Sequence, residues 1–324
     1  MTDRRTLITG ALAAAALPHW AFAQAAPGKV PRPEVAFRVP EMNPRVTDLV
    51  AQVDQARLRA DVETLAGFGT RWSEGPGYGA VEDWMAGAFG RAGPGGAVAR
   101  QPVTLPAGMI RNNVIWGDPL DGREVVLVGA HLDTISENPG LSAPGANDNG
   151  SGIAAMLEAL RILSGQSFSR QIVCVGFTGE EQGLIGSARC AAVATQQRWP
   201  VELMVNLDML GYRPPDPAAP LFIEYDQGNA TPANNAAAAA YGQMAVALAG
   251  QHMSLATAQT DIWDSDYMPF EAAGFPCIGF YDGGASGPDY HSSSDTADRV
   301  DYGRLEQATR LLVATVATAA DLTA

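Results

Sequence analysis

The sequence is short of cysteine and of positive charge. Its 324 residues include three cysteines and no Cys-x-x-Cys pair, so neither a disulfide framework nor a cysteine zinc finger is expected. Its 21 Lys and Arg residues stand against 35 Asp and Glu residues, which gives a net charge of −14. Such a charge repels phosphate backbones and anionic lipid headgroups. We therefore expect neither nucleic acid nor a membrane surface as a partner.

Long apolar runs are also absent, although 47% of the residues are apolar. The longest candidate, residues 7–17, is shorter than the about 20 residues that cross a bilayer. It follows Arg4 and Arg5 and precedes an Ala-Phe-Ala sequence at 21–23, a pattern typical of a signal peptide over residues 1–23. The paired arginines resemble a twin-arginine export signal. We expect a periplasmic or secreted protein.

The remaining chain is expected to form one domain. Residues 24–44 contain five prolines and indicate an extended leader. Residues 45–324 show no internal repeat and no linker. Their apolar patterns predict strands that alternate with helices, which is typical of an α/β fold with a central, mostly parallel mixed β-sheet sandwiched by helices. Helices are predicted within 46–65, 78–89, 153–163, 183–194, 235–250 and 302–319, and strands at 103–105, 113–116, 124–128, 172–177, 201–207 and 275–280.

Histidine and acidic residues follow the predicted strands. In open α/β sheets, ligands bind beyond the carboxyl ends of the strands. Four predicted strands lead into such residues, which are His131 and Asp133, Glu180 and Glu181, Asp208, and His291. Two imidazoles with several carboxylates form a mixed nitrogen and oxygen ligand set that suits zinc, with manganese or cobalt as substitutes. The alternative for either histidine alone is an ordinary hydrogen-bonded residue.

Local spacing suggests roles for four of the acids. Asp133 lies two residues after His131, so on extended backbone it could accept a hydrogen bond from the second ring nitrogen. Asp148 precedes an apolar helix, where it could be a simple N-cap or an ionised ligand. The adjacent Glu180 and Glu181 would repel each other if buried together. A metal on one and a reactive water on the other would remove that conflict.

Five segments together resemble the co-catalytic di-zinc aminopeptidases of the bacterial leucyl aminopeptidase and aminopeptidase S type. They occur in the family's order between residues 129 and 296. The matching segments are His131-Leu132-Asp133, the glycine-rich stretch 145–152, Gly179 to Ser187, Asn206 to Met209, and Tyr290-His291 with Asp295-Thr296.

The resemblance implies an aminopeptidase with two Zn²⁺ ions and a peptide as its substrate. A metal-bridging hydroxide would attack the N-terminal peptide bond, and Asp148 would bridge the two metals. The remaining ligands would be His131 and Asp208 on one metal and Glu181 and His291 on the other.

The resemblance also implies roles beside the metals. Glu180 would be the general base, and Asp133 would assist catalysis by supporting a ligand. The peptide bond between Asp148 and Asn149 would be cis, as it is in the family. A substrate with a free α-amine would need a nearby carboxylate, for which Glu180 and Asp208 are candidates.

The chain departs from the family in two places. Where many relatives have Ser-Asp-His, it has Ser265-Asp266-Tyr267, which removes an imidazole. The tyrosine that helps to hold the oxyanion in relatives has no unambiguous match. Tyr267, Tyr281 and Tyr290 are the candidates, each with core or rim packing as the alternative.

Other functions on the same scaffold stay open at this stage. A carboxypeptidase or dipeptidase would need a basic pocket, whereas Arg189 and Arg299 lie near the motifs without forming a cluster. A glutaminyl cyclase-like enzyme would keep one zinc ion. In a non-enzymatic binding ectodomain, other residues would have replaced some of the metal ligands. The preferred terminal residue, the oligomeric state and the pairing of Cys174, Cys190 and Cys277 are not determined by the sequence.

Overall fold

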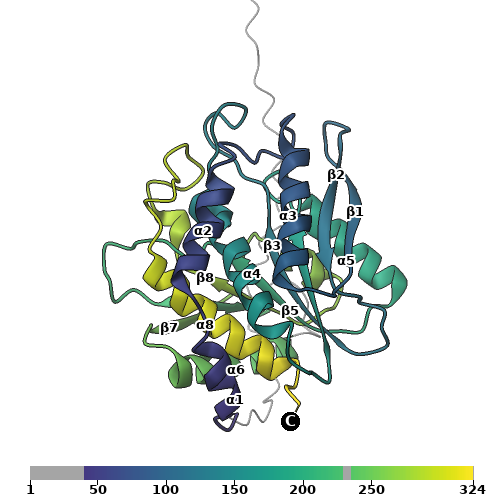
Figure 1. Ribbon diagram of the computed structural model, residues 1–324, viewed down its shortest axis with the longest axis vertical. Coiled ribbons are helices and arrows are strands. Elements are labelled where there is room, and N and C mark those ends of the chain that lie inside the picture. The colour runs from purple at the N-terminus through teal and green to yellow at the C-terminus, as the bar shows by residue number, and fades with distance from the viewer. Residues whose placement is uncertain (1–39, 229–234, 324) are drawn as a thin grey trace, which may run out of the picture.

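The fold is built on one mixed sheet, which the computed structural model describes together with its helices over residues 40–228 and 235–323 (Figure 1). The strands lie in the order β1-β2-β4-β3-β5-β8-β6-β7. Their bounds are β1 (Val98–Thr104), β2 (Ile110–Trp116), β3 (Val125–His131), β4 (Gln171–Phe177), β5 (Val201–Asp208), β6 (Leu221–Tyr225), β7 (Thr257–Thr260) and β8 (Cys277–Tyr281).

The middle of the sheet is parallel and its flanks are mixed. β4, β3, β5 and β8 are neighbours that run in the same direction. β1 and β2 add an antiparallel hairpin at one side, whereas β6 runs antiparallel to β8 and parallel to β7 on the other. The predicted fold class is therefore confirmed, and the carboxyl ends of four central strands meet at one edge.

Helices cover both faces of this sheet. On one face, visible in front in Figure 1, α1, α2, α3, α4, α6 and α8 bury the larger core against the strands. On the other face, α5 and α7 cover a smaller core. The helices are α1 (Pro44–Val50), α2 (Gln55–Ala66), α3 (Tyr78–Ala92), α4 (Gly152–Leu163), α5 (Ile185–Gln197), α6 (Asn235–His252), α7 (Tyr267–Ala272) and α8 (Tyr302–Ala319).

Burial on both faces explains the sequence of β3. All seven of its residues are buried, which is why the strand is a nearly continuous apolar run instead of an alternating one. Gly129 is required within it, because a Cβ there would lie 2.3 Å from the ring of Phe177. The strand delivers His131, its last residue, to the edge where the other carboxyl ends meet.

The structure corrects some predicted boundaries. The helical pattern at 46–65 belongs to two helices, because Asp54 caps α2 by accepting a hydrogen bond from the Ala56 N–H and so ends the run between them. The short elements β6, β7 and α7 were not predicted. β7 is partly exposed and polar, and α7 is only six residues long and contains Pro269.

The predicted signal peptide and most of the leader lie outside the described residues, so both stay predictions. Within residues 40–228 and 235–323, none of the helices is both long and apolar enough to cross a membrane. The three cysteines are buried and unpaired.

Candidate metal centre

The predicted ligands meet at the carboxyl edge of the sheet. His131 and Asp208 are the last residues of β3 and β5. Asp148 lies in the kinked turn η1 (Ala146–Ser151), which leads into α4 and in which Asp148 and Asn149 have non-helical backbone angles. Glu181 follows β4, and His291 lies beyond β8. All five predicted ligands are therefore brought together from five different segments.

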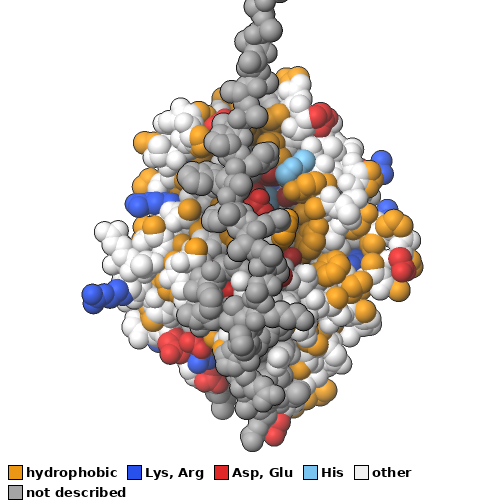
Figure 2. Space-filling view, turned by 180° about the vertical axis from the view of Figure 1, so that it is seen from behind, with side chains coloured by type: hydrophobic (Ala, Val, Ile, Leu, Met, Phe, Trp, Pro, Cys, Tyr) orange, Lys and Arg blue, Asp and Glu red, His pale blue; other side chains and the backbone are white. Residues whose placement is uncertain are grey.

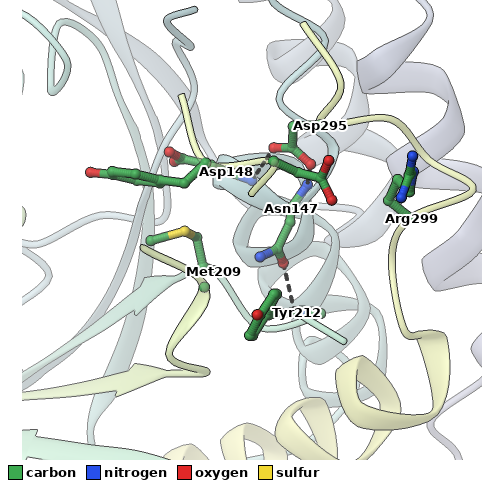
Figure 3. Close-up of a pocket in the computed structure, with 10 residues that line it drawn as sticks. Asn147, Asp148, Met209, Tyr212, Asp295 and Arg299 are labelled. Carbon is green, nitrogen blue, oxygen red and sulfur yellow. Dashed lines mark hydrogen bonds between the residues drawn. The ribbon is translucent and has the colours of Figure 1, made fainter. Parts of the chain in front are cut away.

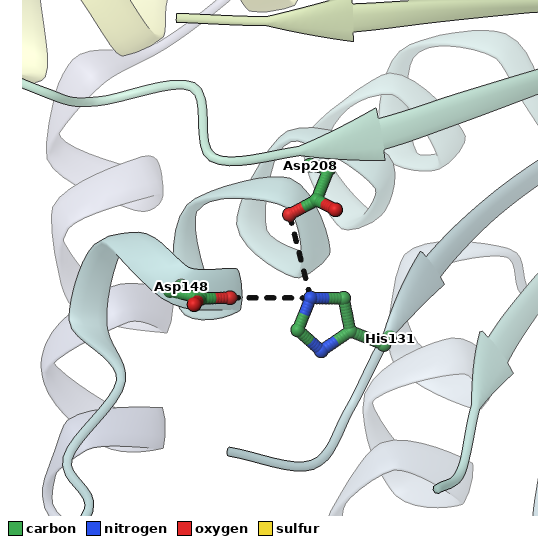
Figure 4. A group of neighbouring side chains, drawn as sticks. All are labelled: His131, Asp148 and Asp208. Atoms are coloured by element: carbon green, nitrogen blue, oxygen red, sulfur yellow. Dashed lines mark hydrogen bonds and ion pairs between the residues drawn. The ribbon is translucent and has the colours of Figure 1, made fainter. Parts of the chain in front are cut away.

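The first group of donors surrounds the imidazole of His131 (Figure 4). Its Nε2 atom lies 3.2 Å from Oδ1 of Asp148 and 3.4 Å from Oδ1 of Asp208. The other ring nitrogen, Nδ1, lies 3.1 Å from the backbone carbonyl oxygen of Asp133. Because a carbonyl can only accept, Nδ1 carries the proton in the neutral ring, and Nε2 is left to act as a ligand.

The second group surrounds His291. Its Nε2 atom lies 3.3 Å from Oδ2 of Asp148 and 3.0 Å from Oε2 of Glu181. The two oxygens of the Asp148 carboxylate thus face different histidines. The peptide bond between Asp148 and Asn149 is cis, as expected.

The donor set fits divalent cations. The ligand atoms within each group lie within 4.8 Å of one another, and nitrogen with carboxylate oxygen is a set that zinc accepts. Oε1 of Glu181 is buried and has no hydrogen-bond partner among the described residues, a costly state that a cation would relieve.

The charges of the site also favour the binding of cations. Burial and the charge of Asp148 raise the pKa of the Glu181 carboxyl to about 7. Burial alone would lower the pKa of His291, but hydrogen bonds to Asp148 and Glu181 raise it to about 10. In this arrangement protons on the imidazoles supply the positive charge that the crowded carboxylates require, and metal ions would supply it instead.

Glu180 lies beside both groups without being needed to complete either. One of its carboxylate oxygens is within 4.8 Å of the ligand atoms of His131 and Glu181. Burial raises the pKa of its carboxyl well above the usual value, against the attraction of His131. A half-buried acid in this position can exchange a proton with a molecule bound at the centre.

Asp133 differs from the prediction in what it contacts. Its carboxylate does not accept a hydrogen bond from His131. The Nδ1 atom of His131 contacts the backbone carbonyl oxygen of Asp133 instead. The buried carboxylate accepts the backbone N–H groups of Gly179, Glu180 and Glu181 at 2.9, 3.2 and 3.3 Å. The loop after β4 curls around this carboxylate, so Asp133 fixes the positions of Glu180 and Glu181.

Two further side chains, whose contacts the sequence did not predict, fix Asp208 and the turn that carries Asp148. Ser265 donates a hydrogen bond of 2.6 Å to Oδ2 of Asp208, and it accepts one from Asn206. The buried side chain of Asn149 donates to the carbonyl of Leu207 and accepts from the backbone N–H of Met209. Asn149 thus ties the turn that carries Asp148 to the end of β5.

A buried arginine, also not predicted, joins the surrounding loops. The fully buried side chain of Arg71 donates to the backbone carbonyls of Leu132, Pro144 and Gly145. These carbonyls lie just after His131 and just before the turn that holds Asp148. Burial lowers the pKa of this guanidinium to about 10, so the side chain stays charged at neutral pH.

Asp295 supports Asp148 directly (Figure 3). Its buried carboxylate accepts the backbone N–H groups of Asn147 and Asp148 at 2.9 and 2.8 Å. The sequence pointed to Asp295 only as part of a matching segment. These residues border a small pocket of about 20 Å³, room for about one water molecule. Arg299 also lines that pocket, and its guanidinium stands apart from Asp148.

The three candidate tyrosines differ in how their hydroxyl groups are used. The Tyr267 hydroxyl donates to Glu224 and accepts from the backbone N–H of Trp263. The Tyr281 hydroxyl accepts from the backbone N–H of Ala285. Tyr290, stacked on His291 with 3.7 Å between ring centroids, has no hydroxyl partner within the described ranges. Tyr290 therefore keeps a free donor beside the centre.

A larger cavity of about 500 Å³ opens beside the donors. Its walls include His131, Asp148, Glu180, Asp208 and His291. Figure 2 shows a histidine gathered with acidic and hydrophobic side chains on the face opposite to that in Figure 1. The candidate metal centre is therefore open to a ligand of considerable size.

The sequence of this chain matches a known protein family. Peptidase family M28 matches residues 113–316. A probable zinc metalloprotease of Pyricularia oryzae is 36% identical over 50% of this chain and 36% of its own length. A probable leucine aminopeptidase of Arthroderma otae is 30% identical over 60% of this chain and 54% of its own. The chain thus spans about half the length, or less, of these curated relatives.

Among solved structures, that of LapA from Legionella pneumophila superimposes with a TM-score of 0.76. The match covers 89% of this chain and 79% of that one, at 19% sequence identity. At this identity the likeness shows the shared fold.

We expect the Asp295→Asn variant to bind Zn²⁺ about 10- to 100-fold more weakly, the range seen when groups behind metal ligands are removed. An amide has one oxygen, so its NH₂ group would face one of the two backbone N–H groups that Asp295 accepts. Competition with a chromogenic chelator measures the affinity.

Asp298→Asn is the matched control, because Asp298 is exposed on the same loop and accepts a hydrogen bond from Thr296. The control should keep the wild-type affinity. Equal affinities of Asp295→Asn and the wild type would contradict the role given to Asp295.

Proposed function

Because this chain belongs to peptidase family M28, we propose that it is a zinc-dependent aminopeptidase that releases the N-terminal residue of peptides. The observation that carries the proposal is the Asp148 carboxylate, whose two oxygens face His131 and His291 separately. One donor group on each side of a shared carboxylate is the arrangement expected for a two-metal site.

The proposed ligands divide into two sets that share Asp148. His131 and Asp208 would hold one zinc ion, and Glu181 and His291 the other. When bound, the metal ions would supply Lewis acidity and an acidified water molecule. Asp133, Ser265, Asn149 and Asp295 keep these ligands in place through the hydrogen bonds described above.

Glu180 is the proposed general base. Its carboxylate reaches both donor groups, and its backbone N–H is fixed by Asp133. It would take a proton from the attacking water and deliver that proton to the nitrogen of the leaving amine. Such a transfer typically contributes about 10²- to 10⁴-fold to the rate.

The charge of the larger cavity supports an aminopeptidase over a carboxypeptidase. A carboxypeptidase needs a cation for the substrate's terminal carboxylate, yet within the described part of the chain no Arg or Lys lines this cavity. Glu180 and Asp208 do line it, and their carboxylates suit a protonated α-amine.

Tyr290 is the proposed donor to the developing oxyanion. Its phenol borders both pockets, and its hydroxyl is unengaged, whereas the Tyr267 hydroxyl already joins Glu224 to Trp263. The stacking on His291 holds the ring beside the centre. A donor fixed in advance stabilises the charge without reorganisation.

Export belongs to the same proposal. The pattern at residues 1–23 supports a signal peptide, and we propose that the enzyme acts on peptides in the periplasm or outside the cell. The free peptide is the only partner that the proposal requires.

The zinc-loaded protein should cleave amino-acyl anilides with a free α-amine and leave the N-acetylated forms intact. Removal of zinc by a chelator should abolish the cleavage, and added Zn²⁺ should restore it. Release of the aniline, followed by absorbance, is the measurement. Equal cleavage of the acetylated substrates would contradict an aminopeptidase, and full activity without metal would contradict the metal requirement.

The Glu180→Gln variant should lose about 10²- to 10⁴-fold in kcat, because an amide cannot accept and return the proton. Its zinc content should equal that of the wild type, since Glu180 completes neither donor group. Metal analysis and kinetics on one preparation measure both quantities. Wild-type turnover at full zinc occupancy would rule out the role.

The Tyr290→Phe variant should lose about 10²- to 10³-fold in kcat, the effect of removing one oxyanion donor. Tyr241→Phe is the matched control, because the Tyr241 hydroxyl bonds to Glu202 near the opposite end of β5. The control should turn over like the wild type. Comparable kcat values for the two variants would exclude Tyr290 as the donor.

A further inference from the structure

The cavity beside the metal centre contains a buried acid that the proposed mechanism does not use. Along β6, Leu221, Ile223 and Tyr225 point into the larger core. Because side chains alternate along a strand, Phe222 and Glu224 point to the other face, where both line the cavity. Glu224 is only 6% exposed.

The structure holds Glu224 in place through a tyrosine and a glycine. The buried Tyr267 hydroxyl donates a hydrogen bond of 2.7 Å to Oε2 of Glu224. The Tyr267 ring passes directly over Gly279 of β8, where a Cβ would lie 2.5 Å from the ring and 2.9 Å from the Glu224 carboxylate. Only glycine at this position leaves room for the Tyr267–Glu224 hydrogen bond. The Glu224 carboxylate is therefore held in a fixed position in the cavity wall.

The same tyrosine fixes the rim of the cavity. Its hydroxyl accepts the backbone N–H of Trp263 at 2.9 Å, and the Trp263 side chain is 70% exposed at the cavity. Phe222 and Tyr281 form another wall, stacked with 5.9 Å between ring centroids. Aromatic faces pack against the methylene stem of a long side chain and attract a cation at its end.

Apart from the two histidines of the metal centre, every charged side chain that lines the cavity is acidic. Asp208, Asp261 and Asp264 line the same cavity, whereas no Arg or Lys of the described residues does. Burial raises the pKa of the Glu224 carboxyl to about 8; the Tyr267 hydrogen bond lowers it, and Asp208 and Asp261 raise it. A buried acid among other acids is stabilised in its ionised form when a cation enters the cavity.

We propose that this cavity receives the side chain of the substrate's first residue and that Glu224 selects one that ends in a cation, lysine or arginine. The inference rests on the proposed aminopeptidase function and adds its specificity. Phe222, Trp263 and Tyr281 hold the apolar stem, and Glu224 with its acidic neighbours pairs with the charge.

Lysyl and norleucyl anilides test the selection in the zinc-loaded wild type, because norleucine keeps the linear stem of lysine without the ammonium group. We expect kcat/KM for the lysyl substrate to be about 10- to 100-fold higher, the range for one charge-assisted hydrogen bond. An equal or higher value for norleucine overturns the inference, whatever the variants do.

Glu224→Gln keeps the shape of the side chain and removes its charge. We expect the lysine-to-norleucine ratio of kcat/KM to fall at least about tenfold. Glu63→Gln is the control, since Glu63 lies exposed on α2 and its loss removes the same charge from the protein; its ratio should match the wild type. A ratio unchanged in Glu224→Gln overturns the inference.

The two proposals fail in different ways. If the wild type cleaves norleucyl or leucyl anilide with a kcat/KM equal to that for lysyl anilide, the aminopeptidase function stands and the selection by Glu224 falls. If the zinc-loaded wild type cleaves none of these free-amine substrates, the aminopeptidase function falls, and the inference about Glu224 falls with it.

Discussion

The arrangement of the site depends on one carboxylate, that of Asp148, which lies between two histidines. Asp148 directs one oxygen at His131 and the other at His291, and these histidines come from segments 160 residues apart. Much of the surrounding polar network fixes this residue: Asp295 holds its backbone N–H, Asn149 ties its turn to the end of β5, and Arg71 binds the carbonyls before the turn. Such supporting contacts determine how precisely a site is held.

The excess of acid over base in the sequence has its counterpart in this centre. Carboxylates that converge in a buried site repel one another, and the raised pKa values of Glu181 and Glu224 express that repulsion and the loss of water. We propose that metal ions offset the negative charge at Glu181 and that the positive charge of the substrate offsets it at Glu224. The same physical need for a cation thus connects the proposed chemistry to the proposed specificity.

The sequence predicted the site better than its supports. Four of the five candidate ligands could be located from the sequence because each comes after a strand of clear apolar pattern, and the sheet brings the carboxyl ends of these strands together. Asp148 precedes a helix instead, so its place in the candidate set came from the family resemblance. Helix α8 was predicted at its observed bounds. The contacts of Asp133, Arg71 and Asn149 could not be predicted, because each meets backbone groups that are close only after folding. Glu224 was missed for a different reason: its strand, β6, is only five residues long and follows a proline-rich loop, so no strand was predicted there.

Anomalous diffraction from crystals of the zinc-loaded protein, collected on both sides of the zinc absorption edge, tests the central claim most directly. The account predicts two peaks per chain, one beside His131 and Asp208 and one beside Glu181 and His291, with the Asp148 carboxylate between them. A single peak at full zinc saturation, or peaks away from these side chains, would contradict it.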